Sequence, residues 1–174
     1  MLPKTKRQLD FNDRLMESVI AYLEPFNDEQ LNRQPGPGQW SALQVVHHVM
    51  RAEKLSLAYI QKKLSYKPAL PSVGFTWYWR RIVLWLATHV PVKLKAPANV
   101  STEFLPEQSK LAETIAEWKQ VRTELRSYLE SLPNELFHKI IYRHPIAGLM
   151  PLEGMLYFFR AHLERHFKQI KRSL

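Results

Sequence analysis

Apolar residues recur three and four positions apart over most of the chain, and this spacing is typical of helices that bury one face. Four long helices are predicted, over about 4–23, 41–64, 106–132 and 151–171, with a short helical turn at 27–31. The buried stripe of the first helix consists of Leu9, Leu15, Val19, Ile20 and Leu23. The third helix repeats the pattern with Leu111, Ile115, Trp118, Val121, Leu125, Tyr128 and Leu129. The pattern therefore favours helices over a sheet.

Turn and capping residues mark where these helices begin and end. The run from Gln34 to Gly38 holds two prolines and two glycines, which no regular element can cross. Ser41, with Gln44 three residues later, fits a capping box at the start of the second helix. Pro133 ends the third helix, an irregular stretch follows, and Pro151 fits the first turn of the last helix. The predicted fold is all-α, an antiparallel four-helix bundle with extra short helices and no strands, in one domain over residues 1–174.

The stretch 65–106 is the least regular part of the chain, because five prolines surround one aromatic, apolar segment from Trp77 to Val90. We expect an extra short helix there. Its tryptophans and arginines suit an anchor that lies in a membrane surface. Packing against the bundle or against a second subunit is the preferred interpretation, because the polar face that such an anchor needs is poorly developed.

Composition narrows the class of protein. The 174 residues include no cysteine, which excludes disulfides, zinc fingers, iron–sulfur clusters and thiolate nucleophiles, and leaves histidine and carboxylates as metal ligands. The first residues lack the apolar run of an export signal, and Arg80 and Arg81 interrupt the longest apolar stretch, 75–92. We therefore expect a cytoplasmic protein with no membrane partner.

The net charge of +9, from 25 basic and 16 acidic residues, suits an anionic partner. The basic residues are spread along the chain rather than gathered into one block, which is typical of a solvated surface. Nucleic acid is therefore not the expected partner.

The last helix carries His162 and His166, four residues apart and therefore one turn apart on one side. With Leu152 at zero on a helical projection, the two histidines fall at about 280 and 320 degrees, within the apolar stripe. Two neutral imidazoles buried on adjacent turns need a shared partner, and a metal ion is one. Leu163 stands where a zinc protease has its catalytic glutamate, so this class is excluded.

A third ligand is expected from the second helix, which offers His47 and His48. Periodicity does not choose between them, because they lie on opposite flanks of the apolar face. His47 lies beside Arg51 and Lys54, whose positive charge opposes a bound cation, so His48 is preferred. We expect no metal role for His47, His89 or His138.

Several short motifs resemble those of the DinB-like proteins, a family that includes YfiT-type metal-dependent hydrolases and bacterial thiol S-transferases. The resemblance covers most of the chain and lies in Trp40 and Ser41, His48 and Val49, Glu53, Lys95 to Pro97, His144 to Gly148, His162 to His166, and Gln169 and Ile170. It implies a four-helix bundle of the DinB/YfiT type and one divalent ion held by His48, His162 and His166.

Three histidines leave coordination positions open, as catalytic sites require, so we expect an enzyme that uses a metal-activated water or thiol as nucleophile. Zinc or nickel is the expected ion, with iron and manganese as further candidates. The resemblance implies a small-molecule substrate, with a low-molecular-weight thiol as one candidate. A homodimer is one candidate assembly, and the subunit count stays open. The alternative is a ligand- or nucleic-acid-binding bundle without enzymatic activity, whose metal site is structural or vestigial.

Three residues are expected to support this site. Gln169 and Glu53 are candidates to orient the ligand histidines from behind, although an arginine partner is an equal alternative for Glu53. His144 precedes a loop with proline and glycine that is expected to cover one end of the bundle, where a substrate enters.

Overall fold

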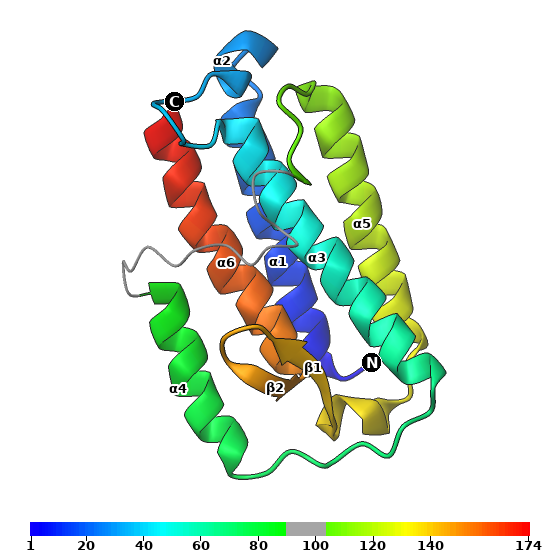
Figure 1. Cartoon of the computed structure of the whole chain (residues 1–174). Coiled ribbons are helices and arrows are strands. Elements are labelled where there is room, and N and C mark those ends of the chain that lie inside the picture. The colour runs from blue at the N-terminus through cyan, green and yellow to red at the C-terminus, as the bar shows by residue number, and fades with distance from the viewer. Residues whose placement is uncertain (90–103) are drawn as a thin grey trace.

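The computed structural model describes residues 1–89 and 104–174. Four long helices form a bundle (Figure 1): α1 (Pro3–Leu23), α3 (Ala42–Ser65), α5 (Leu111–Ser131) and α6 (Leu152–Ser173). The shorter elements are α2 (Asp28–Asn32), α4 (Thr76–His89), the 3₁₀ helix η3 (Asn134–His138), and the strands β1 (Ile140–His144) and β2 (Gly148–Pro151). The predicted four-helix bundle is confirmed, and each helix lies within a few residues of its predicted position.

The four helices do not simply alternate in direction. Contacts between α1 and α6 join Lys4 to Glu153 and Asn12 to Leu156, so these two helices run parallel. Residues later in α3 contact residues later in α5, so these two helices also run parallel, whereas α1 and α5 run in opposite directions. Figure 1 shows that α4 lies on the long connection that returns the chain from the end of α3 to the start of α5. That crossover explains why only some neighbours in the bundle are antiparallel.

Local sequence accounts for the start of α3. The Ser41 side chain accepts a hydrogen bond from the backbone N–H of Gln44, and the Gln44 side chain accepts one from the backbone N–H of Ser41. This predicted capping box satisfies backbone donors that a helix end leaves free. Asn27 and Gln30 form a second capping box, at α2.

The prediction that strands are absent is wrong. β1 and β2 form an antiparallel hairpin in which His144 pairs with Gly148 and Arg143 with Leu149. Gly148 has a φ of +73°, a conformation that favours glycine and closes the turn. Ile140 and Ile141 are buried in succession, so the strand lacks the alternation by which half-buried strands are recognised.

Helix α4 packs against α6 and the hairpin through one side only. Its Trp77 ring lies so close to Gly154 that a Cβ atom there would overlap the ring, and Arg80 Nη1 donates to the carbonyl of Leu149 at 2.7 Å. Leu84 is buried on the same side. Among the described helices, none is long and apolar enough to cross a membrane.

A polar layer crosses the bundle between two apolar clusters. One cluster includes Phe137, Met155 and Phe159 near the hairpin, and the other includes Leu31, Val45 and Trp118 near α2. Between them, the buried Glu53 accepts hydrogen bonds from Arg122 Nε at 2.7 Å, Arg122 Nη2 at 2.5 Å and Trp118 Nε1 at 3.0 Å. Burial raises the pKa of Glu53, and the contacts with Arg122 oppose that rise. Asn12 lies in the same layer and donates to the carbonyl of Leu156.

Replacing Arg122 with methionine should strongly destabilise the fold. The variant leaves the Glu53 carboxylate buried without its cation, which costs about 3–5 kcal/mol of unfolding free energy. Urea denaturation monitored by circular dichroism measures this loss. The double variant Glu53→Gln/Arg122→Met should recover much of it, because the glutamine amide keeps an acceptor for Trp118 without a buried charge.

Lys119→Ala is the matched control on the same helix. Lys119 makes an ion pair with Glu17 at 3.2 Å in which both side chains are about half exposed, so its loss should cost about 1 kcal/mol or less. An Arg122→Met variant as stable as Lys119→Ala would contradict the assignment of Glu53 as a charged, paired group.

Candidate metal centre

Three histidine side chains meet between α3 and α6. His48 comes from α3, and His162 and His166 come from successive turns of α6. Nε2 of His48 lies 3.2 Å from Nε2 of His162, and one nitrogen of each ring lies within 4.8 Å of the others. The structure thus brings the three expected ligands to one point, with His48 buried at 4% exposure.

The spacing of one pair of these nitrogens and the chemistry of all three rings fit a divalent ion. Two imidazole nitrogens bound to a tetrahedral zinc ion at about 2.0–2.1 Å lie roughly 3.3 Å apart. The separation of 3.2 Å between His48 and His162 agrees with this value. The cluster found among the described residues consists of histidines alone, a donor set that suits zinc, nickel, copper or ferrous iron better than magnesium or calcium.

Burial keeps these rings uncharged. Desolvation, with a further contribution from neighbouring histidines, lowers the pKa of His162 well below its usual range. Desolvation and the nearby His48 lower the pKa of His166 to about 3, although its hydrogen bond with Gln169 opposes this shift. The two rings are therefore neutral at pH 7. Only the neutral imidazole offers a lone pair to a metal ion, so the protein holds both side chains in the form that binds.

Gln169 fixes the orientation of one ring. Its Oε1 lies 2.8 Å from Nδ1 of His166, one turn earlier on α6. The amide oxygen can only accept a hydrogen bond, so Nδ1 carries the proton and the lone pair lies on Nε2. Gln169 thus contacts the ring of His166, one of the three candidate ligands.

Glu53 does not lie behind a ligand. It follows His48 by five residues, which turns it about 140 degrees around α3 and directs it toward α5 instead of α6. Its hydrogen bonds go to Trp118 and Arg122. The arginine partner, which the sequence analysis kept as an alternative, is the one observed, and the orienting role expected for Glu53 is not.

Two aromatic rings that were not predicted as part of the site pack on two of the histidines. Trp40 packs on His48 with ring centroids 4.8 Å apart, and Phe158 stacks on His162 at 4.9 Å and 28°. Phe158 precedes His162 by four residues, and this spacing on a helix was the signal available for it. Apolar rings limit water around the nitrogens and favour the neutral histidines.

His144 lies one ring away from this centre. Its side chain is 6% exposed and packs edge-on against Phe158, with centroids 4.4 Å apart. Its Nδ1 accepts hydrogen bonds from the backbone N–H groups of Ile146 and Ala147, both at 3.1 Å. Because Nδ1 accepts, the neutral ring carries its proton on Nε2. Burial lowers the pKa of His144 to about 4, so this tautomer persists at neutral pH.

His47 and His138 lie apart from the cluster. Nε2 of His47 lies 3.2 Å from Oγ1 of Thr114, on the side of α3 that faces α5. His138 is exposed on η3. The side chain of His89 and the motif Lys95 to Pro97 lie outside the described part of the chain.

Comparison with known proteins identifies the family of the chain and a solved structure with a similar fold. Residues 12–170 match the DinB superfamily. Among solved structures, the fold is similar to that of YfiT from Bacillus subtilis, with a TM-score of 0.59, 21% identity, and coverage of 96% of this chain and 86% of that one. YfiT is described as a probable metal-dependent hydrolase with an unusual four-helix bundle topology. The comparison with curated proteins gave no match.

The stability of the protein should fall in acid partly through His144. Its folded pKa of about 4 lies below the unfolded value of about 6.5, so the unfolded chain takes up a proton first as the pH falls. The contribution of His144 to the free energy of unfolding is fully present above pH 6.5 and is lost as the pH falls toward 4. Between pH 7 and 4.5, the wild type should lose roughly 2–3 kcal/mol more than His144→Asn, as measured by urea denaturation.

Asparagine keeps an acceptor for the two backbone N–H groups but does not titrate. His138→Asn, at an exposed position, should retain the wild-type dependence on pH. Identical pH profiles for the wild type and His144→Asn would show that His144 is not buried as a neutral ring.

Proposed function

Because the chain belongs to the DinB superfamily, we propose that it is a divalent-metal-dependent enzyme whose ion is held by His48, His162 and His166. The observation that carries this proposal is the convergence of three imidazole nitrogens within 4.8 Å, two of them on rings held neutral by burial. Zinc or nickel is the proposed ion, followed by iron and manganese. With 21% identity, the similarity to YfiT supports the fold, so the activity is argued from the site.

The site is suited to nucleophilic attack on a small molecule. A bound divalent ion supplies Lewis acidity, which makes a water or a thiol a stronger nucleophile at neutral pH. The three histidines leave coordination positions open, Gln169 fixes the His166 ring, and the rings of Trp40 and Phe158 limit access of bulk water. Both a hydrolase and a thiol S-transferase use this chemistry, so a low-molecular-weight thiol is one proposed substrate.

We assign His144 to the substrate side of the centre. Its Nδ1 is held by the hairpin turn, which leaves Nε2–H as a hydrogen-bond donor of fixed orientation. Through Phe158 it is separated from His162 by a single aromatic ring. A neutral donor near the metal can stabilise negative charge that develops on a substrate oxygen or leaving group.

Metal binding is the first test of the proposal. Protein purified without a histidine tag and loaded with zinc should hold one ion per chain, as measured by elemental analysis and titration calorimetry. His162→Ala should weaken binding by at least about 100-fold, and Gln169→Ala by about 10- to 100-fold, because Gln169 orients a ligand ring. His138→Ala removes an exposed histidine and should leave binding unchanged. Equal affinity in the wild type and His162→Ala would remove the basis for the proposed site.

Turnover of ester and thiol-reactive substrates is the second test. His162→Ala should keep its circular dichroism spectrum yet lose activity with the metal. His144→Phe should bind metal normally and lower kcat by about 10- to 100-fold, as expected for the loss of one hydrogen-bond donor to developing charge. Wild-type protein that binds metal but turns over neither substrate class would favour a binding module. Salt-sensitive retention of DNA would favour the nucleic-acid alternative.

A further inference from the structure

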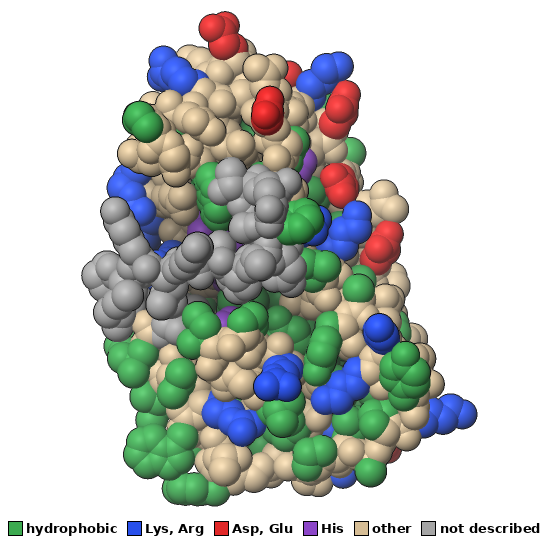
Figure 2. All heavy atoms as spheres, viewed as in Figure 1, with side chains coloured by type: hydrophobic (Ala, Val, Ile, Leu, Met, Phe, Trp, Pro, Cys, Tyr) green, Lys and Arg blue, Asp and Glu red, His purple; other side chains and the backbone are tan. Residues whose placement is uncertain are grey.

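Helix α4 turns an apolar face away from the rest of the protein. Phe75, just before the helix, is 75% exposed and Trp79 is 63% exposed. The other exposed apolar side chains of this face are Tyr78, Ile82, Val83 and Leu86. Together they present roughly 600 Å² of surface, at the upper end of what monomeric proteins leave uncovered. Figure 2 shows hydrophobic side chains gathered over α4.

The stretch of sequence that carries α4 has charged residues of one sign. No aspartate or glutamate occurs between Glu53 and Glu103, whereas this stretch holds eight lysines and arginines. Arg81 is exposed on α4 itself. Figure 2 shows basic side chains among the hydrophobic ones in the lower part of the molecule, while most acidic side chains visible on that face lie in its upper part.

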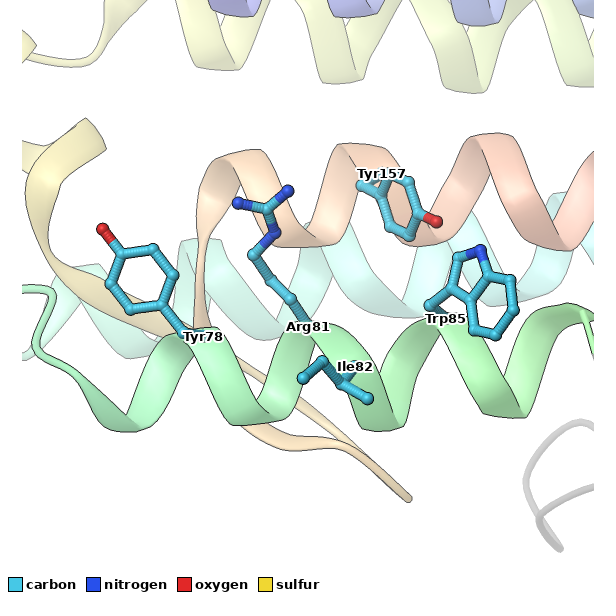
Figure 3. Close-up of a pocket in the computed structure, with 5 residues that line it drawn as sticks. All are labelled: Tyr78, Arg81, Ile82, Trp85 and Tyr157. Carbon is cyan, nitrogen blue, oxygen red and sulfur yellow. The ribbon is translucent and has the colours of Figure 1, made fainter.

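A pocket of about 390 Å³ adjoins the apolar face at the junction of α4 and α6. Tyr78, Arg81, Ile82, Trp85 and Tyr157 line it, as Figure 3 shows. Figure 3 shows the Arg81 guanidinium extending from α4 toward α6, and this cationic donor suits a phosphate group. An apolar face beside a basic, donor-lined pocket matches the two layers of a lipid surface, acyl chains and headgroups.

We propose that the outer face of α4 docks the protein on an anionic phospholipid surface. The helix would lie in the plane of the interface, with Phe75 and Trp79 in the apolar layer and Arg81 at the phosphates. The sequence argued against a membrane-surface anchor because α4 has no well-developed polar face. The structure explains why α4 does not need one, since its opposite side packs on α6 and the hairpin and does not face water.

A second copy of the chain suits this face less well. Symmetric pairing of two α4 helices would bring each Arg81 and its basic neighbours toward their own copies. Helix α4 itself supplies no carboxylate to neutralise them. Like charges placed together in an interface oppose association, whereas an anionic membrane surface attracts each of them.

Vesicle sedimentation at low salt tests the proposal. The full-length protein should sediment with vesicles of phosphatidylglycerol and phosphatidylcholine, but not with phosphatidylcholine alone. Phe75→Ser/Trp79→Ser should weaken binding at least tenfold, and Arg81→Gln about fivefold, as expected for one basic residue at an anionic surface. Tyr66→Ser, which removes another highly exposed aromatic ring, and Arg14→Gln, which removes an exposed charge on α1, should bind as the wild type does.

Three results would overturn the proposal. One is a wild-type protein that ignores anionic vesicles, and another is binding that the α4 variants leave unchanged. The third is a dimer, detected by sedimentation velocity, that Phe75→Ser/Trp79→Ser dissociates, because the face would then be a subunit interface. Circular dichroism and zinc titration of each variant verify that the fold and the histidine cluster are intact, so failure here is separable from failure of the metal site.

Discussion

The polar layer between the two apolar clusters is the constraint on which the rest of the structure depends. A carboxylate buried in a bundle needs hydrogen-bond donors, and both oxygens of Glu53 accept hydrogen bonds, from Arg122 and Trp118. Those contacts join α3 to α5 at one level along the bundle. The opposite side of α3 faces α6 near this level, and there His48 meets His162. Fixing α3 on one side therefore helps to position the proposed metal-binding face on the other.

Much of the fold was predictable because its signals are local. Helical spacing and the Ser41 capping box depend on residues within one or two turns of one another, and each appears where it was expected. The hairpin was missed because its strands are short, and Ile140 and Ile141 are buried in succession against tertiary neighbours. The parallel neighbours in the bundle were missed for a related reason. The apolar periodicity of α3 and α5 does not indicate the path of the connection between them, and that path determines their relative direction.

In the candidate site, too, the features that depend on local spacing were predictable and those that depend on contacts between elements were not. His162 and His166 share a face of one helix, so their proximity follows from spacing alone. The apolar periodicity of α3 did not distinguish His48 from His47, and the choice of His48 depended on the positive charges beside His47 and then on the resemblance to the DinB-like family. Glu53 shows the limit of a family motif, because position alone did not reveal that it pairs with Arg122 on a third helix. The Trp40 and Phe158 rings and the hydrogen bonds that hold His144 depend on contacts between elements, which spacing within one element does not determine.

Helix α6 connects the two proposed surfaces. Tyr157 lines the pocket beside α4, and the next residue, Phe158, stacks on His162 inside the bundle. Successive helical residues point about 100 degrees apart, so neighbouring side chains serve the pocket and the metal centre from one rigid backbone. A protein docked through α4 would consequently hold its histidine cluster at a fixed height and orientation above the lipid. Because Tyr157 and Phe158 are adjacent on one rigid helix, docking through α4 would constrain how a substrate approaches the histidine cluster.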